Sequence, residues 1–156
     1  MDKTIGLGSF YDIVHPKKEI AIKSSSSDEK YGQIYKMILQ NTAQAKLLHW
    51  QSFRYGQHIA LDGLFSGIID LGDELAETLM GKYGRPVLSE SDLNLKLMNF
   101  KSPEEGDLSE FMNHLTKCYQ SDCRSLLDQE KDTDLINIVD EILALVNKTK
   151  YLISLK

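Results

Sequence analysis

Residues 58–77 read HIALDGLFSGIIDLGDELAE, and this stretch decides the fold. Its apolar residues recur every three or four positions, which is the spacing of one buried helix face. Gly81, Gly84 and Pro86 follow shortly afterwards, and these residue types are typical of helix ends. The stretch predicts a long amphipathic helix over about residues 57–80, with a core stripe of Leu61, Leu64, Phe65, Ile68, Leu71, Leu75 and Leu79.

A second face of this helix carries an imidazole and three carboxylates. Their pattern is H-x3-D-x10-D-x3-E, made by His58, Asp62, Asp73 and Glu77. At about 100° per residue, the four side chains fall within an arc of roughly 100°. Imidazole and carboxylate groups are the ligands that iron and manganese take in proteins. The face is therefore a candidate metal-binding face.

One copy of the helix cannot bring all four groups to one metal. The pair His58/Asp62 precedes the pair Asp73/Glu77 by about fifteen residues, or roughly 22 Å along the axis. Two copies packed antiparallel about a twofold axis would place each first pair against the partner's second pair. We expect that axis to pass near residues 67–68, beside the small residues Ser66 and Gly67.

The wider segment, residues 49–84, reads HWQSFRYGQHIALDGLFSGIIDLGDELAETLMGKYG. It resembles the first two helices of the Dps-type mini-ferritins, the DNA-binding proteins from starved cells. That family has an HW dipeptide near the end of its first helix, as at His49 and Trp50 here. Its second helix carries H-x3-D-G and D-x3-E at the separation found here. The link from His49 to His58 is shorter than the family's usual link.

The resemblance implies a ferritin-like four-helix bundle that oxidises Fe²⁺ with peroxide or oxygen and sequesters Fe³⁺. It implies iron as the metal, with manganese or zinc as alternative occupants, and a ferroxidase centre shared across a twofold dimer that grows into a twelve-subunit shell. The residues implied as both metal ligands and catalytic groups are His49, His58 and Asp62 from one subunit, with Asp73 and Glu77 from its neighbour.

The remaining periodicity completes an all-α bundle of ferritin-like type. We expect an irregular N-terminal segment over residues 1–27 and one bundle domain over residues 28–156. The other expected helices cover about residues 28–53, residues 107–129 and the stretch that begins at Asp132 or Thr133. A short amphipathic helix over residues 92–100 is expected in the long connection between the second and third long helices.

Composition limits the classes of protein. With 42% hydrophobic and 26% charged residues, the 156-residue chain is typical of a soluble domain. No apolar run of about eighteen residues predicts a membrane span, and the N-terminus lacks a secretory pattern. Cys118 and Cys123, five apart in an expected helix, would point in different directions, so no disulfide and a cytoplasmic location are expected.

DNA binding is not expected, because the formal net charge is −5 and residues 1–27 hold four lysines against three acidic residues. Glu-x-x-His, the usual motif of a di-iron site inside one bundle, does not occur in the chain.

Other interpretations remain open for each residue and for the whole chain. On the alternative interpretation, His49 is an ordinary interface histidine and His58 lines the start of the helix. Each carboxylate, taken singly, is then a solvated surface residue. His15 and His114 receive no role. For function, the alternatives are a non-catalytic bundle that serves as a structural or interaction module with a vestigial site, and a nucleoid-binding protein without oxidase activity.

Overall fold

The computed structural model describes residues 26–86, 88, 96–102 and 108–155. These residues form helices and no strand, so the predicted all-α class is confirmed. The predicted irregular segment, residues 1–27, lies almost wholly outside the described residues. Within the described part, no helix is long and apolar enough to cross a membrane.

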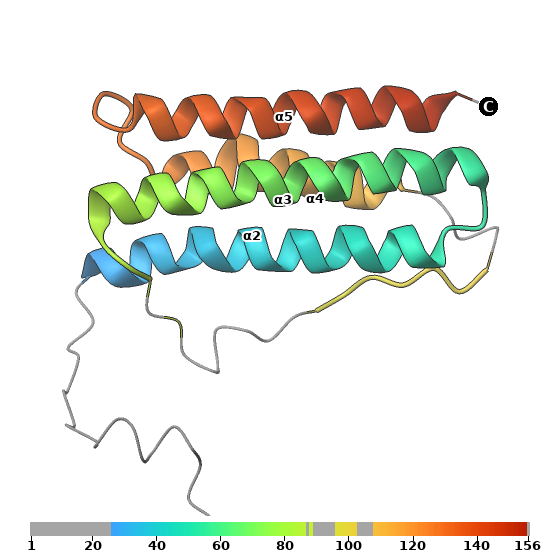
Figure 1. Cartoon of the computed structure of the whole chain (residues 1–156), viewed down its shortest axis with the longest axis horizontal. Helices are drawn as coiled ribbons and strands as arrows, with labels where there is room; N and C mark the ends of the chain where they lie inside the picture. Colours follow the sequence, from blue (N-terminus) through green and yellow to red (C-terminus); the bar gives the residue numbers. More distant parts are fainter. Residues whose placement is uncertain (1–25, 87, 89–95, 103–107, 156) are drawn as a thin grey trace, which may run out of the picture.

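Four helical stretches lie side by side along one axis (Figure 1). In chain order they are α2 (Ser26–Gln51), α3 (Tyr55–Tyr83), α4 (Ser109–Lys117) continuing into η3 (Cys118–Cys123), and α5 (Thr133–Ser154). In Figure 1, α3 lies between α2 and α5, and α4 lies behind it. Among the described residues, this arrangement leaves one long side of α3 uncovered by the other helices.

The buried stripe of α3 is close to the predicted one. Its fully buried leucine and isoleucine side chains face the core, whereas Phe65 and Leu71 are partly buried at the edges. The helix is slightly longer than predicted at both ends, and the chain turns at residues 52–54. Gly84 follows α3 with φ of 89°, a backbone region that favours glycine, so the predicted stop is confirmed.

Gly67 lies where α3 packs closely on α5. A β-carbon there would lie 2.5 Å from Leu145 Cδ2. The prediction that Gly67 lies beside a twofold axis on the outer face is therefore wrong, because this residue packs on α5. The small residues on the outer face are Gly63 and Ser66, and both are exposed.

The predicted short helix over residues 92–100 is wrong for the residues that the structure describes. Residues 96–100 are not helical, and residues 92–95 lie outside the described part. The side chain of Gln44 in α2 accepts a hydrogen bond from Met98 N at 2.6 Å and donates one to Met98 O at 2.9 Å. Gln51 Oε1 accepts one from Phe100 N at 2.9 Å. Glutamine side chains thus satisfy backbone groups that a helix would have paired with one another.

The helix that contains Cys118 and Cys123 changes pitch. It begins at Ser109, and the segment between the two cysteines is a π-helix, whose hydrogen bonds join residues five apart. The expectation of no disulfide agrees with two free, buried thiols. Its reasoning was wrong, however, because residues five apart in a π-helix lie about one turn apart. Burial raises the pKa of both thiols, that of Cys123 to about 12.

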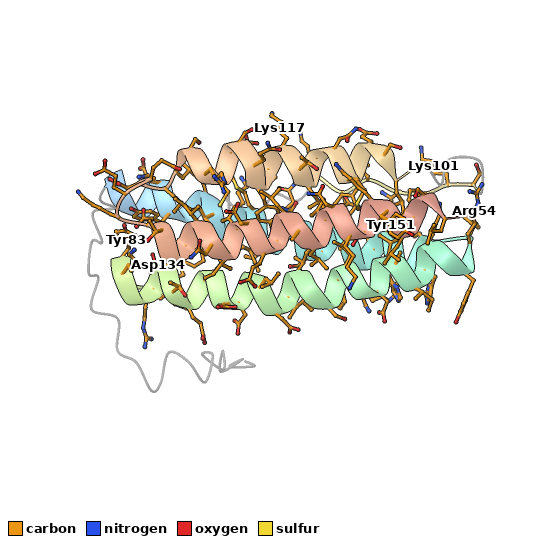
Figure 2. All side chains as sticks on the ribbon, turned by 90° about the horizontal axis from the view of Figure 1, so that it is seen from above. Arg54, Tyr83, Lys101, Lys117, Asp134 and Tyr151 are labelled. Atoms are coloured by element: carbon orange, nitrogen blue, oxygen red, sulfur yellow. The ribbon has the colours of Figure 1, made fainter. Side chains whose placement is uncertain are left out.

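The end of α3 is tied to the start of α5 by a buried carboxylate. Asp132 is fully buried and accepts hydrogen bonds from Tyr83 Oη and, at 2.8 Å, from the backbone N–H of Asp128. Lys82 Nζ lies 3.1 Å from Asp132 Oδ1 and 2.7 Å from Asp134 Oδ1. Figure 2 shows Tyr83 and Asp134 at this end of the bundle, opposite Arg54. We call this network the Asp132 latch.

Candidate metal-binding site

His49 and His58 meet across the turn between α2 and α3. His49 lies in the last turn of α2 and is buried, with 8% of its surface exposed, and His58 lies one turn into α3. Their rings stack with centroids 4.0 Å apart and a tilt of 30°. The turn between the helices is short, so these two histidines are held together by the local chain path.

Each histidine uses Nδ1 in a hydrogen bond to the backbone of the other. His49 Nδ1 lies 3.2 Å from His58 O, and His58 Nδ1 lies 3.1 Å from His49 O. A carbonyl oxygen only accepts, so Nδ1 carries the proton in each ring. In the neutral imidazole, the unprotonated nitrogen is then Nε2. Metal-binding histidines characteristically donate their other N–H in this way.

Ser52 supports the same arrangement from the turn. Its hydroxyl donates to His49 O at 2.8 Å and lies 3.2 Å from His58 Nδ1. Sequence reasoning missed this residue. A serine three positions after a histidine at a helix end is the signal that was available, because serine hydroxyls often satisfy the last carbonyls of a helix.

Asp62 completes a half-site with the two histidines. It follows His58 by one helical turn, and its Oδ1 lies 3.7 Å from His49 Nε2. The His49 side chain is only 10% exposed whereas that of Asp62 is 56% exposed. In this half-site the imidazole of His49 is therefore buried, whereas the carboxylate of Asp62 is accessible from outside the bundle.

Asp73 and Glu77 lie farther along the same uncovered side of α3. Both are exposed, as is Asp62. Asp73 is eleven residues after Asp62, or about 16 Å along the helix. Among the described residues, no three His, Cys, Asp or Glu side chains gather closely enough to hold a metal ion. One chain thus places His49 against His58 and 3.7 Å from Asp62 without forming a complete metal site, and it leaves Asp73 and Glu77 apart.

The outer side of α3 is both acidic and apolar. Figure 2 shows its side chains pointing away from the bundle along the length of the helix, with no other helix over them. On the same helix, Ile59 and Ile69 are 50% and 40% exposed, and Ile69 lies between Asp62 and Asp73 in the sequence. A helix with half-exposed isoleucines near its carboxylates is suited to contact with another protein surface.

Comparison with known proteins gives one finding. A model of the family described as "Family of unknown function (DUF5856)" matches residues 49–153. The matched region begins at His49 and contains all five predicted site residues. No curated protein and no solved structure matches the chain.

Proposed function

We propose that this chain, which belongs to the DUF5856 family, is a ferroxidase that binds Fe²⁺ at a site shared by two copies. Peroxide, or more slowly oxygen, oxidises the iron, and Fe³⁺ is then sequestered. The observation that carries the proposal is the reciprocal hydrogen bonding of His49 and His58 through Nδ1, which leaves Nε2 as the unprotonated nitrogen of each ring, with that of His49 3.7 Å from Asp62 Oδ1.

The second half of the site is supplied by a partner copy in this proposal. Asp73 and Glu77 are exposed on the side of α3 that no other helix covers. Antiparallel packing of two α3 helices brings these carboxylates to the partner's histidine half-site, with Gly63 and Ser66 allowing close approach. A dimer of this kind has two equivalent sites. We also propose that this dimer grows into a ferritin-like assembly of twelve subunits.

The donor set fits iron better than a soft metal. Two imidazoles and three carboxylates are typical ligands of iron and manganese, and zinc is a further alternative occupant. Two Fe²⁺ ions give two electrons to one hydrogen peroxide, which takes up two protons and yields two water molecules. The alternative stoichiometry is one tightly bound Fe²⁺ per site, which the same ligands can also hold.

The test is an anaerobic Fe²⁺ titration followed by a pulse of peroxide. We expect saturable binding and fast oxidation in the parent, and loss of both in an Asp73→Asn, Glu77→Gln variant. The matched control is Asp70→Asn, Glu74→Gln, which removes the same charges from the same exposed helix beside the site. Background-rate oxidation in parent and variants alike would refute the proposal, as would equal loss in the control.

A second candidate is a non-catalytic bundle that acts as a structural or interaction module. The observation that favours it is that these residues also satisfy a backbone carbonyl at the end of α2. The carbonyl oxygen of His49 accepts a hydrogen bond from the Ser52 hydroxyl and lies 3.1 Å from His58 Nδ1. A chain that remains a monomer or dimer and oxidises no iron would support this candidate.

A further inference from the structure

A second group of metal-capable side chains lies in a cavity of about 470 Å³ between α2 and the α4–η3 helix. It is separate from the outer side of α3. Its volume lies in the range of small-ligand sites. The residues that line it are Gln33, Lys36, Met37, Gln40, Asn41, His114, Cys118 and Asp122.

A buried amide lies at the inner wall of this cavity. Asn41 is 1% exposed in the middle of α2, on the face that packs into the core. Its Oδ1 accepts a hydrogen bond from His114 Nε2 at 3.1 Å, and its Nδ2 donates to Cys118 Sγ at 3.3 Å. One amide therefore holds an imidazole and a thiol at the same wall.

Two helical pairs contribute to the lining of the cavity. Met37 and Asn41 are one turn apart on α2, and His114 and Cys118 are one turn apart where α4 meets the π-helix. Next to Cys118, the hydroxyl of Tyr119 is buried without a hydrogen-bond partner among the described residues, although the Asn41 side chain lies near it. Buried hydroxyls are rarely left without a partner, and π-helical turns are frequent at functional sites.

The lining atoms select the class of ligand. Met37 offers a thioether, Cys118 a thiol and His114 an imidazole. Among the described residues, no three His, Cys, Asp or Glu side chains gather closely enough to hold a metal ion. The cavity therefore lacks the ligands that a divalent cation bound by such groups would need. Because Asn41 bridges His114 and Cys118, the two do not form a nucleophilic pair. Sulfur ligands select Cu⁺.

We propose that Met37, His114 and Cys118 form a binding site for a soft monovalent cation, Cu⁺. As the Cys118 sulfur binds the ion, its thiol proton leaves for the solvent, and no electron is transferred. Asn41 is a positioning residue that holds the thiol and the imidazole at the cavity wall. This site shares no residue with the proposed iron site and does not depend on it.

The test is a titration of the full, reduced chain with Cu⁺ under anaerobic conditions, against a chromogenic Cu⁺ chelator. We expect one equivalent to be withdrawn from the chelator, together with an ultraviolet thiolate-to-copper band. Cys118→Ser should abolish the band and the tight binding. Met37→Leu, which nearly preserves side-chain volume, should weaken binding by about tenfold or more.

The matched control is Cys123→Ser, which removes the other buried thiol of the π-helix but not a residue that lines the cavity. It should bind Cu⁺ like the parent. Equal binding by Cys118→Ser, or equal loss in Cys123→Ser, would overturn the proposal. If Cys118→Ser fails to fold by circular dichroism, Met37→Leu and His114→Gln decide, because parental binding in both rules the site out. The Asp73→Asn, Glu77→Gln variant should keep Cu⁺ binding, so failure of one site is separable from failure of the other.

Discussion

The two ends of the bundle use their polar residues differently. At the Asp132 latch, the buried carboxylate has Tyr83, Lys82 and a backbone N–H around it. At the opposite end, His49 and His58 have their Nδ1 atoms bonded, and Nε2 of His49 lies 3.7 Å from Oδ1 of the half-exposed Asp62. One network is closed within the chain, and the other is open on one side.

This difference separates stability from function. A closed, buried network stabilises the fold, and removing one partner leaves another buried group without compensation. An open network contributes less to stability, because part of it faces solvent, but it retains the capacity to bind. We therefore expect substitutions at the latch to unfold the protein without changing its chemistry, and substitutions at the histidine end to do the reverse.

The largest expected effect on stability is that of Asp132→Ala. The change leaves Tyr83 and Lys82 without their buried acceptor and should lower the free energy of unfolding by about 3 kcal/mol. Urea denaturation measures this loss. The control Asp134→Ala removes a carboxylate whose side chain is 53% exposed and should have a much smaller effect. Similar losses in the two variants would show that the latch is not the stabilising network.

Acid should weaken the latch only as the pH falls into the range of the lowered pKa of Asp132. Burial alone raises the pKa of Asp132, but the hydrogen bonds from Tyr83, the Asp128 amide and Lys82 outweigh burial and hold that pKa below its ordinary value. A carboxyl with a lowered pKa stabilises the fold above its unfolded pKa of about 3.9, and this contribution is lost as pH falls through the folded pKa. Denaturation of parent and Asp132→Asn from neutral pH downward should give curves that converge below about pH 4. A constant gap at all pH values would contradict this expectation.

Ser52→Ala should have an intermediate effect on stability. It removes the hydroxyl that donates to His49 O, at a cost of about 1 kcal/mol. Because Ser52 also contacts His58 Nδ1, Fe²⁺ affinity should fall by roughly tenfold. The control Ser154→Ala changes an exposed serine at the end of α5 that also donates to a helix carbonyl, that of Tyr151, but makes neither contact. Unfolding and Fe²⁺ titration, measured on both variants, test whether the turn supports the site.

Asp62→Ala should have the smallest effect on stability and a large effect on activity. Its side chain is 56% exposed, so the free energy of unfolding should stay within about 0.5 kcal/mol of the parent value. Fast oxidation of Fe²⁺ by peroxide should nevertheless be lost. A variant that oxidises Fe²⁺ as fast as the parent would refute the assignment of Asp62.

The helices and their buried faces were predictable because apolar periodicity reflects burial directly. The contacts of His49 with His58 and Asp62 follow from a short turn and helix geometry, whereas the metal site expected from these residues stays a prediction. The bend of the chain over residues 96–100 was not predictable, because it depends on Gln44 and Gln51 bonding to a backbone that is distant in sequence. Gly67 was misplaced because the sequence does not tell which neighbour a small residue approaches.

The π-helix was missed for a different reason. Its sequence, CYQSDC, carries the same apolar spacing as an α-helix, and only packing against the neighbouring helices shows the extra residue in the turn. Asn41 was an available signal for the contacts of this segment, since it is one of the polar residues, with Gln44 and His49, that α2 buries. A buried amide needs partners, and His114 and Cys118 were the polar residues left without a role.

The reciprocal histidine bonds also bear on the order of assembly. They join residues only nine apart in sequence, so the loop that closes them is short and forms early at low entropic cost. The histidine pair therefore belongs to a hairpin within one chain, whereas completion of the site in the proposed dimer requires a bimolecular encounter. Dilution should then abolish the shared site while the helices remain folded, and activity per chain should rise with protein concentration. In the proposed dimer, the concentration of the protein in the cell would then determine whether the shared site forms.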